Sequence, residues 1–222
     1  MAGGGLGVRA GRRGRYGWLR SAATAGAALA ALVLSGGSAA AAVPHWTLVT
    51  SPDPSAESNH LTGVSCVSAT YCMATGYYFN GTVWKTLVLK WNGTKWSKKS
   101  TPDPATVNYN QLQGVSCQSA SFCMAVGYYY NGAAPQTLIL KWNGTAWSQV
   151  RSPNLGSTDE LYGVSCPSAA FCMADGWYDN NSTQQNLMLR WNGTKWSKMS
   201  SPNPATGVYN SLSGVGCAGA SF

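Results

Sequence analysis

Residues 63–72 read Gly-Val-Ser-Cys-Val-Ser-Ala-Thr-Tyr-Cys, and the first four of these residues recur along the chain. Gly-Val-Ser-Cys returns at residues 114–117 and 163–166, and Gly-Val-Gly-Cys follows at residues 214–217. The first cysteine of each copy therefore steps by 51, 49 and 51 residues. A fixed period of this size indicates a repeat architecture such as a solenoid, a propeller or an array.

A second marker, Trp-Asn-Gly-Thr-x-Trp, appears at residues 91–96, 142–147 and 191–196 with the same steps. Between the markers lie short runs rich in Val, Tyr, Trp and Leu, which Gly, Asn, Pro and Ser interrupt. No apolar periodicity of 3.6 residues is sustained, so the pattern favours strands over helices.

The first complete unit predicts four strands, at residues 61–66, 71–79, 86–91 and 95–100. Asn92-Gly93 between the last two predicts a two-residue type I′ hairpin, because both positions of that turn need a positive φ. Four short strands are the content of one propeller blade. The sequence therefore predicts an all-β fold: a β-propeller-like array of four-stranded blades, about three full blades plus partial ones.

The unit boundaries follow from the period. Three repeats are expected at about residues 60–104, 111–155 and 160–204. Residues 46–51 align with the last strand of a unit and predict a lone outer strand, and residues 211–222 begin a further repeat. The chain stops at Phe222, one residue before the next cysteine of the pattern. We expect a fragment, or else a unit that must associate to close.

Residues 1–42 have the parts of a secretory signal peptide: an Arg-rich start, an apolar run at 22–34 and small residues up to Ala42. The run is short for a membrane anchor, which is the weaker interpretation. Arg12-Arg13 leaves twin-arginine export open beside the general secretory route. We expect a mature protein at 43–222, secreted or associated with the cell wall, with no membrane span after cleavage.

The net charge of +8 does not indicate nucleic-acid binding. Five of the fifteen basic residues lie in the leader, and the rest of the chain carries a net charge of about +3.

The cysteines predict one disulfide in each repeat, which clamps the hairpin between its first two strands. The spacing C-x5-C occurs three times, and the seventh cysteine, Cys217, has no partner in the sequence. In an exported protein, cysteine pairs that recur at one spacing indicate structural disulfides. Zinc is the rival interpretation, but the ligand spacing is not standard and only His45 and His60 could assist, so no metal site and no cofactor are predicted. The three pairs are Cys66/Cys72, Cys117/Cys123 and Cys166/Cys172.

From Trp46 to Phe222 the chain resembles secreted bacterial β-propellers with Trp- and Gly-rich repeats of the Asp-box (sialidase-like) and kelch-like kinds. The turn at residues 92–96 is similar to a degenerate Asp-box, which has Gly-x-x-Trp at the same hairpin. Trp91 stands where that family has its Asp, and the paired Gly of kelch repeats is absent. The resemblance implies a propeller fold but no inherited activity.

No catalytic constellation is recognisable. Hydrolysis would need two carboxylates that face one another, or a nucleophile with a base. The seven acidic residues occur in no such setting, and the mature chain has two arginines, Arg151 and Arg190, where a sialidase-like site needs three. Asp175 replaces Thr75 and Val126 of the other repeats and is interpreted as a local hydrogen-bonding solution.

Aromatic side chains near the loops predict a binding face. Aromatic rings beside Asn and Asp suit sugar stacking or protein contact. The equivalent residues Tyr77, Tyr128 and Trp177 are interpreted as packing between blades, and the recurrent tryptophans as blade core. The candidate ligand-binding residues are Tyr78, Trp84, Tyr129, Tyr130, Tyr178 and Asp179.

These observations predict a secreted, non-catalytic binding module that recognises an extracellular glycan or protein. Two alternatives stay open. One is a secreted glycoside hydrolase or lyase of propeller fold whose acid and base lie in missing blades, and the other is a purely structural surface protein.

Overall fold

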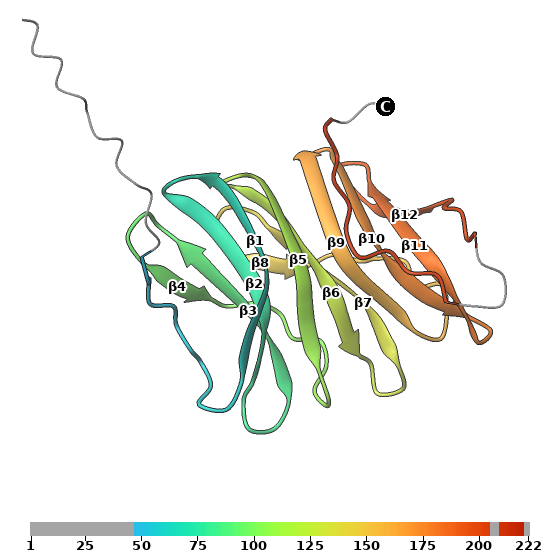
Figure 1. Ribbon diagram of the computed structural model, residues 1–222, viewed down its shortest axis with the longest axis horizontal. Coiled ribbons are helices and arrows are strands. Elements are labelled where there is room, and N and C mark those ends of the chain that lie inside the picture. Colours follow the sequence, from blue (N-terminus) through green and yellow to red (C-terminus); the bar gives the residue numbers. More distant parts are fainter. Residues whose placement is uncertain (1–46, 205–208, 220–222) are drawn as a thin grey trace, which may run out of the picture. The chain divides into compact units, whose positions relative to one another are not determined.

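The computed structural model describes residues 47–204 and 209–219, and within them the fold is all-β (Figure 1). Three antiparallel four-stranded sheets follow one another along the chain, each with its strands hydrogen-bonded in sequence order. This arrangement confirms the predicted blades. No helix that could cross a membrane occurs in these two ranges. The predicted signal peptide, residues 1–42, lies outside them.

Equivalent strands have nearly the same length in all three blades. Blade 1 contains β1 (Asn59–Ser68), β2 (Tyr71–Phe79), β3 (Trp84–Trp91) and β4 (Trp96–Lys99). Blade 2 contains β5 (Asn110–Ser119), β6 (Phe122–Tyr130), β7 (Pro135–Trp142) and β8 (Trp147–Gln149). Blade 3 contains β9 (Asp159–Ser168), β10 (Phe171–Asn180), β11 (Thr183–Trp191) and β12 (Trp196–Met199).

The hairpin between β3 and β4 differs from the predicted type I′ turn. Trp91 pairs with Trp96, so the loop has four residues, and of the Asn92-Gly93 pair only Gly93 has a positive φ, of 96°. The Asn92 side chain accepts hydrogen bonds from the backbone N–H groups of Thr94 and Lys95. The asparagine thus closes the turn with its side chain rather than with a left-handed backbone.

The expected strand at residues 46–51 is not formed over residues 47–51, and Trp46 lies outside the described ranges. A strand needs a neighbour for its backbone hydrogen bonds. Instead, Val49 and Ser51 line an apolar groove on blade 1.

The predicted partial repeat is not a strand over residues 209–219, yet it runs beside blade 3 (Figure 1). Asn210 N donates to Gln184 O at 3.1 Å, and Leu212 N donates to Gly176 O at 3.3 Å. Residues 220–222 of the predicted partial repeat are outside the described ranges, as are residues 205–208, which precede it.

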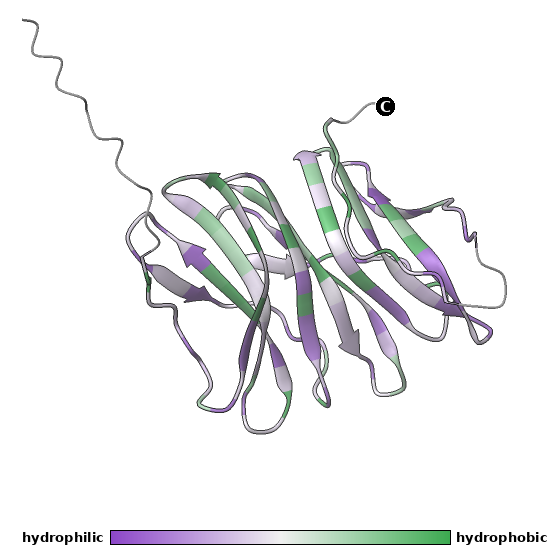
Figure 2. Ribbon diagram, viewed as in Figure 1, coloured by the Kyte–Doolittle hydropathy of each residue, from purple (hydrophilic) through white to green (hydrophobic). Residues whose placement is uncertain are grey.

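The two sides of blade 2 are both buried against a neighbouring blade. In blades 2 and 3 we call the side that faces the preceding blade the front face, and in blade 1 the equivalent side. The opposite side is the back face. Neighbouring residues of a strand point to opposite faces, and the second and third strands carry runs of consecutive buried residues. Hydrophobic residues lie along the strands of all three sheets (Figure 2). On the back of blade 1, Met73 and Val88 pack against Leu112, Leu138 and Leu140 on the front of blade 2. The same arrangement joins blades 2 and 3.

The first strands of the blades approach one another closely through the glycine of each Gly-Val-Ser-Cys motif. A Cβ atom on Gly114 would lie 2.7 Å from the carbonyl oxygen of Tyr162, and one on Gly163 would lie 2.9 Å from the Cα of Gly214. One on Gly63 would lie 3.4 Å from the Cα of Gly114. A side chain at Gly114 or Gly163 would therefore force the blades apart.

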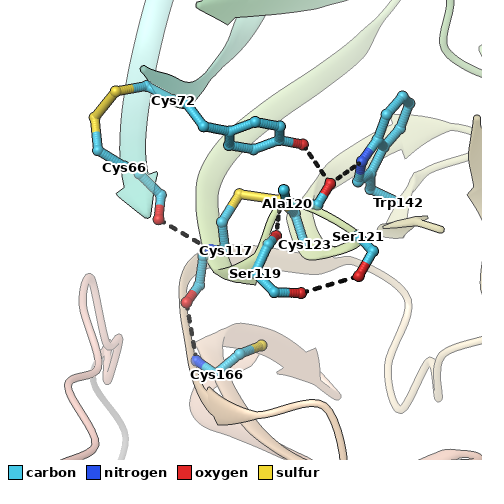
Figure 3. The surroundings of a disulfide bond; sticks show 12 residues. Cys66, Cys72, Cys117, Ser119, Ala120, Ser121, Cys123, Trp142 and Cys166 are labelled. Atoms are coloured by element: carbon cyan, nitrogen blue, oxygen red, sulfur yellow. Dashed lines mark hydrogen bonds between the residues drawn. A yellow bond between two sulfur atoms is a disulfide. The ribbon is translucent and has the colours of Figure 1, made fainter. Parts of the chain in front are cut away.

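Serine side chains reinforce this contact. The Oγ of Ser65 accepts a hydrogen bond from Cys117 N at 2.9 Å, and the Oγ of Ser116 accepts one from Cys166 N at 2.9 Å (Figure 3). Each blade is thus tied to the next by a side chain of the motif that identified the repeat.

Three disulfides are present, as predicted, and each joins the first two strands of a blade at a hairpin end. The Cα atoms of the paired cysteines are 4.0 to 4.1 Å apart. The pairs are Cys66–Cys72, Cys117–Cys123 and Cys166–Cys172.

Two of the cysteines that clamp hairpins as predicted, Cys123 and Cys172, also lie in the packing between blades. Both residues are 0% exposed. Cys123 belongs to the core cluster between blades 1 and 2, and Cys172 to the cluster between blades 2 and 3. The reason is that each lies near the start of the second strand of its blade, where both faces of the sheet are covered. These two cysteines therefore contribute to the interfaces between blades as well as closing a hairpin.

Hydrogen bonds beside the second disulfide also join two blades. The carbonyl oxygen of Ala120 accepts from Tyr71 Oη at 2.8 Å and from Trp142 Nε1 at 3.0 Å (Figure 3). Tyr71 belongs to blade 1, whereas Ala120 and Trp142 belong to blade 2. The end of this hairpin therefore binds blade 1 to blade 2.

Replacing Gly114 by alanine should destabilise the protein by about 2–4 kcal/mol, because the added Cβ collides with backbone rather than with a movable side chain. The control is Gly219→Ala, where no heavy atom of the described residues lies within 4 Å of the added Cβ. Thermal unfolding should show a clear drop for Gly114→Ala and none for Gly219→Ala. Equal unfolding midpoints would contradict the close-contact account.

Candidate ligand-binding groove

Three equivalent tyrosines lie on the front faces of the blades, but only two of them are paired with a lysine. Lys98 Nζ donates to the Tyr78 hydroxyl at 2.8 Å and lies 4.0 Å from the ring centroid. Lys198 Nζ donates to the Tyr178 hydroxyl at 3.1 Å and lies 4.7 Å from that ring. In blade 2 the residue at the lysine position is Gln149.

The third tyrosine, Tyr129, lies where two grooves meet. Its hydroxyl has no hydrogen-bond partner among residues 47–204 and 209–219, and both Tyr129 and Gln149 line each groove. One groove is also lined by Arg151, Asn154, Lys195 and Trp196. The other is also lined by Ala105, Val107, Tyr130 and Asn131.

Two positively charged side chains line the first groove. The side chains of Arg151 and Lys195 are exposed, and neither forms an ion pair within the described part of the chain. No Asp or Glu lines either groove. The combination of a tyrosine ring, amide groups and unpaired cations suits a ligand with apolar faces, hydroxyl groups and negative charge.

Of the six predicted ligand-binding residues, Tyr129 and Tyr130 are brought together in a groove. The remaining tyrosines are not available in this way. Tyr178 is only 6% exposed, within the core between blades 2 and 3, so its predicted surface role is wrong. Tyr78 packs against a core cluster as Tyr129 does, but its ring and hydroxyl are engaged by Lys98 and it lines neither groove.

The side chains of Trp84 and Asp179 contact residues near them on the same blade. The Trp84 ring packs against His60, Tyr77 and Phe79, with centroids 5.3 to 5.8 Å away. The Oδ2 of Asp179 accepts a hydrogen bond from Ser157 Oγ at 3.0 Å. Neither side chain lines a groove with Tyr129.

The predicted disulfide residues lie apart from these grooves. Cys123 and Cys172 are buried in the two cores between blades, and no cysteine lines either groove at Tyr129. The disulfides are therefore structural and contribute no group to the candidate site.

A polar and aromatic network that sequence reasoning missed joins the back of blade 2 to blade 3. Tyr162 Oη donates to Glu160 Oε2 at 2.6 Å, and Trp177 Nε1 donates to Tyr162 Oη at 3.0 Å. The Tyr128 ring centroid lies 6.4 Å from that of Tyr162, and Tyr128 Oη donates to Gln111 Oε1 at 2.7 Å. The packing interpretation of Tyr128 and Trp177 is consistent with these contacts.

The electrostatics of this network favour fixed hydrogen bonds over proton transfer. Burial raises the pKa of Glu160 above its ordinary value, against the lowering effect of the hydrogen bonds from Tyr162 and Trp177. Burial, with the Glu160 hydrogen bond next, raises the pKa of Tyr162 to about 12. The Tyr162 hydroxyl therefore stays protonated at neutral pH and acts as a donor. The sequence contained a sign of this network, because a polar residue occupies the same position in each repeat: His60, Gln111 and Glu160.

Other carboxylates are used in structural hydrogen bonds. Asp103 Oδ1 accepts from Thr86 N at 2.7 Å, and Asp159 Oδ1 accepts from Leu155 N at 2.7 Å. No cluster of three or more potential metal ligands occurs in the described ranges.

Asp175 is the one buried carboxylate without a good hydrogen bond among the described residues. Its side chain is 1% exposed, and neither oxygen has a partner of acceptable geometry there. Burial raises the pKa of Asp175, while the nearby backbone of Gly214 and Gly163 lowers it by less. The predicted local hydrogen bonds therefore do not fully satisfy the Asp175 carboxylate.

Comparison with known proteins adds little about function. No protein-family model and no curated protein sequence matches the chain. A similar solved structure is that of "YCF48 bound to D1 peptide", with 11% sequence identity and a TM-score of 0.39. The similarity covers 62% of this chain and 39% of that one.

Replacing Asp175 by valine, the residue at position 126 of blade 2, should stabilise the protein at pH 7 by about 1–3 kcal/mol, because a poorly satisfied carboxylate is no longer buried. A raised pKa means that the folded state binds the proton more readily. The stability of the wild type should therefore fall as the pH rises from 3.8, the ordinary value for aspartate, toward neutrality.

Thermal unfolding across this pH range checks the expectation. The slope should be smaller in Asp175→Val but not zero, because burial also raises the pKa of Asp159 and Glu160. An unchanged slope together with lower stability at pH 7 would show that the carboxylate is well satisfied.

Proposed function

We propose that the chain is a secreted, non-catalytic binding module that recognises an acidic glycan through the grooves that meet at Tyr129. The observation that carries the proposal is the missing lysine partner of this tyrosine. In blades 1 and 3 the equivalent ring is covered by Lys98 or Lys198. In blade 2 the ring instead borders two grooves.

The chemistry of the lining favours a saccharide. Sugars present C–H faces that pack on an aromatic ring, and their hydroxyl groups need polar partners that fix orientation. Tyr129 supplies the ring and Gln149 an amide group. Asn154 and Asn131 offer their Nδ2 donors, because their Oδ1 atoms already accept hydrogen bonds from backbone N–H groups. Arg151 and Lys195 add positive charge, which favours a glycan with carboxylate groups.

Two further features support an extracellular binding role. The three disulfides are compatible with an oxidising compartment, and the leader has the composition of a signal peptide. A glycoside hydrolase that used these grooves would need a pair of carboxyl groups in their walls, whereas the lining contains amides, aromatics and cations.

The test measures binding of a short galacturonic acid oligomer by isothermal titration calorimetry, with a neutral oligosaccharide of the same length for comparison. Tyr129→Ala and Arg151→Gln should each weaken binding of the acidic oligomer about tenfold, the effect of losing roughly 1.4 kcal/mol. Gln149→Lys should weaken it as well, because it recreates the tyrosine–lysine pair of blades 1 and 3.

Tyr78→Ala is the matched control, since it removes the equivalent ring of blade 1 away from the grooves. It should leave binding unchanged. If all four variants bound the acidic oligomer as tightly as the wild type, the proposed site would be contradicted. Failure of every saccharide to bind, with specific capture of a protein ligand that needs Tyr129, would replace the glycan by a protein.

A further inference from the structure

The first strand of each blade contains a β-bulge just before the glycine of the repeat motif. The pairing of β1 with β2 skips Thr62, that of β5 with β6 skips Gln113, and that of β9 with β10 skips Tyr162. A bulge leaves one residue unpaired and changes the direction of its side chain, which is why bulges are frequent beside functional sites. The skipped residue differs in all three blades, although the glycine that follows it is constant.

In blade 3 the skipped residue holds a carboxylate in place. Tyr162 Oη donates to Glu160 Oε2 at 2.6 Å and accepts from Trp177 Nε1 at 3.0 Å. All three side chains keep part of their surface exposed. Because these hydrogen bonds fix the carboxylate before a ligand arrives, little conformational freedom is lost when one binds.

The negative charge of Glu160 is not balanced by a cation within the described ranges. The ion pair found there joins Lys85 to Asp103. Burial raises the pKa of Glu160, and the groups that lower it are the hydrogen-bond donors Tyr162 and Trp177 rather than a lysine or arginine. A positively charged ligand would therefore compensate a charge that the chain leaves partly buried and unpaired.

Aromatic rings extend from this carboxylate across blade 2. The Tyr128 ring centroid lies 6.4 Å from that of Tyr162 and 5.7 Å from that of Tyr109. Burial first, and the charge of Glu160 next, raise the pKa of Tyr109 and of Tyr128. The carboxylate therefore acts electrostatically on the whole row of rings.

These three rings differ from many other rings of the blades, which already carry a cation from the chain itself. A lysine or arginine lies 4.0 to 6.0 Å from the centroids of seven rings, and none of the seven is Tyr109, Tyr128 or Tyr162. The seven are Tyr71, Tyr78, Phe122, Trp142, Phe171, Tyr178 and Trp191. A cation that binds the row beside Glu160 must come from another molecule.

We call Glu160 together with the rings of Tyr109, Tyr128 and Tyr162 the Glu160 site. We propose that the Glu160 site binds an arginine side chain of a protein partner. A guanidinium group is planar, stacks on aromatic rings and can donate two parallel hydrogen bonds to a carboxylate, which an ammonium group cannot do. The rings continue into blade 1, where Trp84 forms a β-bridge with Tyr109. A chain segment therefore finds more surface here than a single amino acid needs.

The Glu160 site is separate from the grooves of the proposed function. None of its four residues lines a groove at Tyr129. The grooves carry positive charge and the Glu160 site carries negative charge, so the two sites select ligands of opposite sign. The inference adds a second ligand to the module and does not rest on the first.

Isothermal titration calorimetry of the purified chain with a blocked peptide of alternating arginine and glycine tests the proposal. The same peptide with citrulline for arginine keeps the side-chain shape without the charge and should bind at least about tenfold more weakly. A lysine peptide should bind about threefold or more weakly than the arginine peptide. Glu160→Gln should weaken binding of the arginine peptide about tenfold or more.

The fold should tolerate Glu160→Gln, because blade 2 already has this arrangement. Gln111 has the same repeat position, and its Oε1 accepts from Tyr128 Oη at 2.7 Å. Asp179→Asn is the matched control, since it removes one negative charge from the same blade outside the Glu160 site. It should leave binding of the arginine peptide unchanged, and both variants should keep the unfolding midpoint of the wild type.

Tyr129→Ala distinguishes this site from the grooves. It should leave binding of the arginine peptide unchanged, whereas Glu160→Gln should leave binding of the acidic oligomer unchanged. An arginine peptide that does not bind at millimolar concentration, or that binds Glu160→Gln as tightly as the wild type, would overturn the proposal. So would an equal loss of affinity in Asp179→Asn, or a lysine or citrulline peptide that binds as tightly as the arginine peptide.

Discussion

The close contact between inner strands is the constraint on which the rest of this structure depends. Gly114 lies against the backbone of blade 3 so tightly that a Cβ atom would be 2.7 Å from a carbonyl oxygen. Main chain therefore sets the spacing between the blades near this contact. The serine hydrogen bonds at Cys117 and Cys166 cross the same contact at 2.9 Å.

The core follows from that spacing. Neighbouring strand residues point to opposite faces, so one strand contributes to two separate packing clusters. Met73 and Val88 are thus buried against blade 2 while Ala74 and Leu89 on the same strands form the front cluster of blade 1. Repeating one set of residues at each step builds one interface repeatedly, and this explains why the tryptophans and leucines recur so regularly.

Features of interest arise where one blade departs from the pattern. Gln149 in place of lysine leaves Tyr129 without the cation that covers Tyr78 and Tyr178. Asp175 in place of Thr75 or Val126 buries a carboxylate without a good partner. The change in blade 2 removes a tyrosine–lysine contact that the other two blades make and leaves a ring at the edge of a groove.

The amino-acid sequence by itself determined the period, the four strands of each blade and the pairing of six cysteines. These features depend on residues that are close in the chain, such as Cys117 and Cys123 on one hairpin, so a local pattern is sufficient to predict them. Only the tertiary structure decided which side chains are buried between blades. Tyr129 and Tyr178 have the same place in their repeats, yet one lines two grooves and the other is buried. Their exposure depends on partners about 20 residues away in the same blade and about 50 residues away in the next, and only folding brings these together.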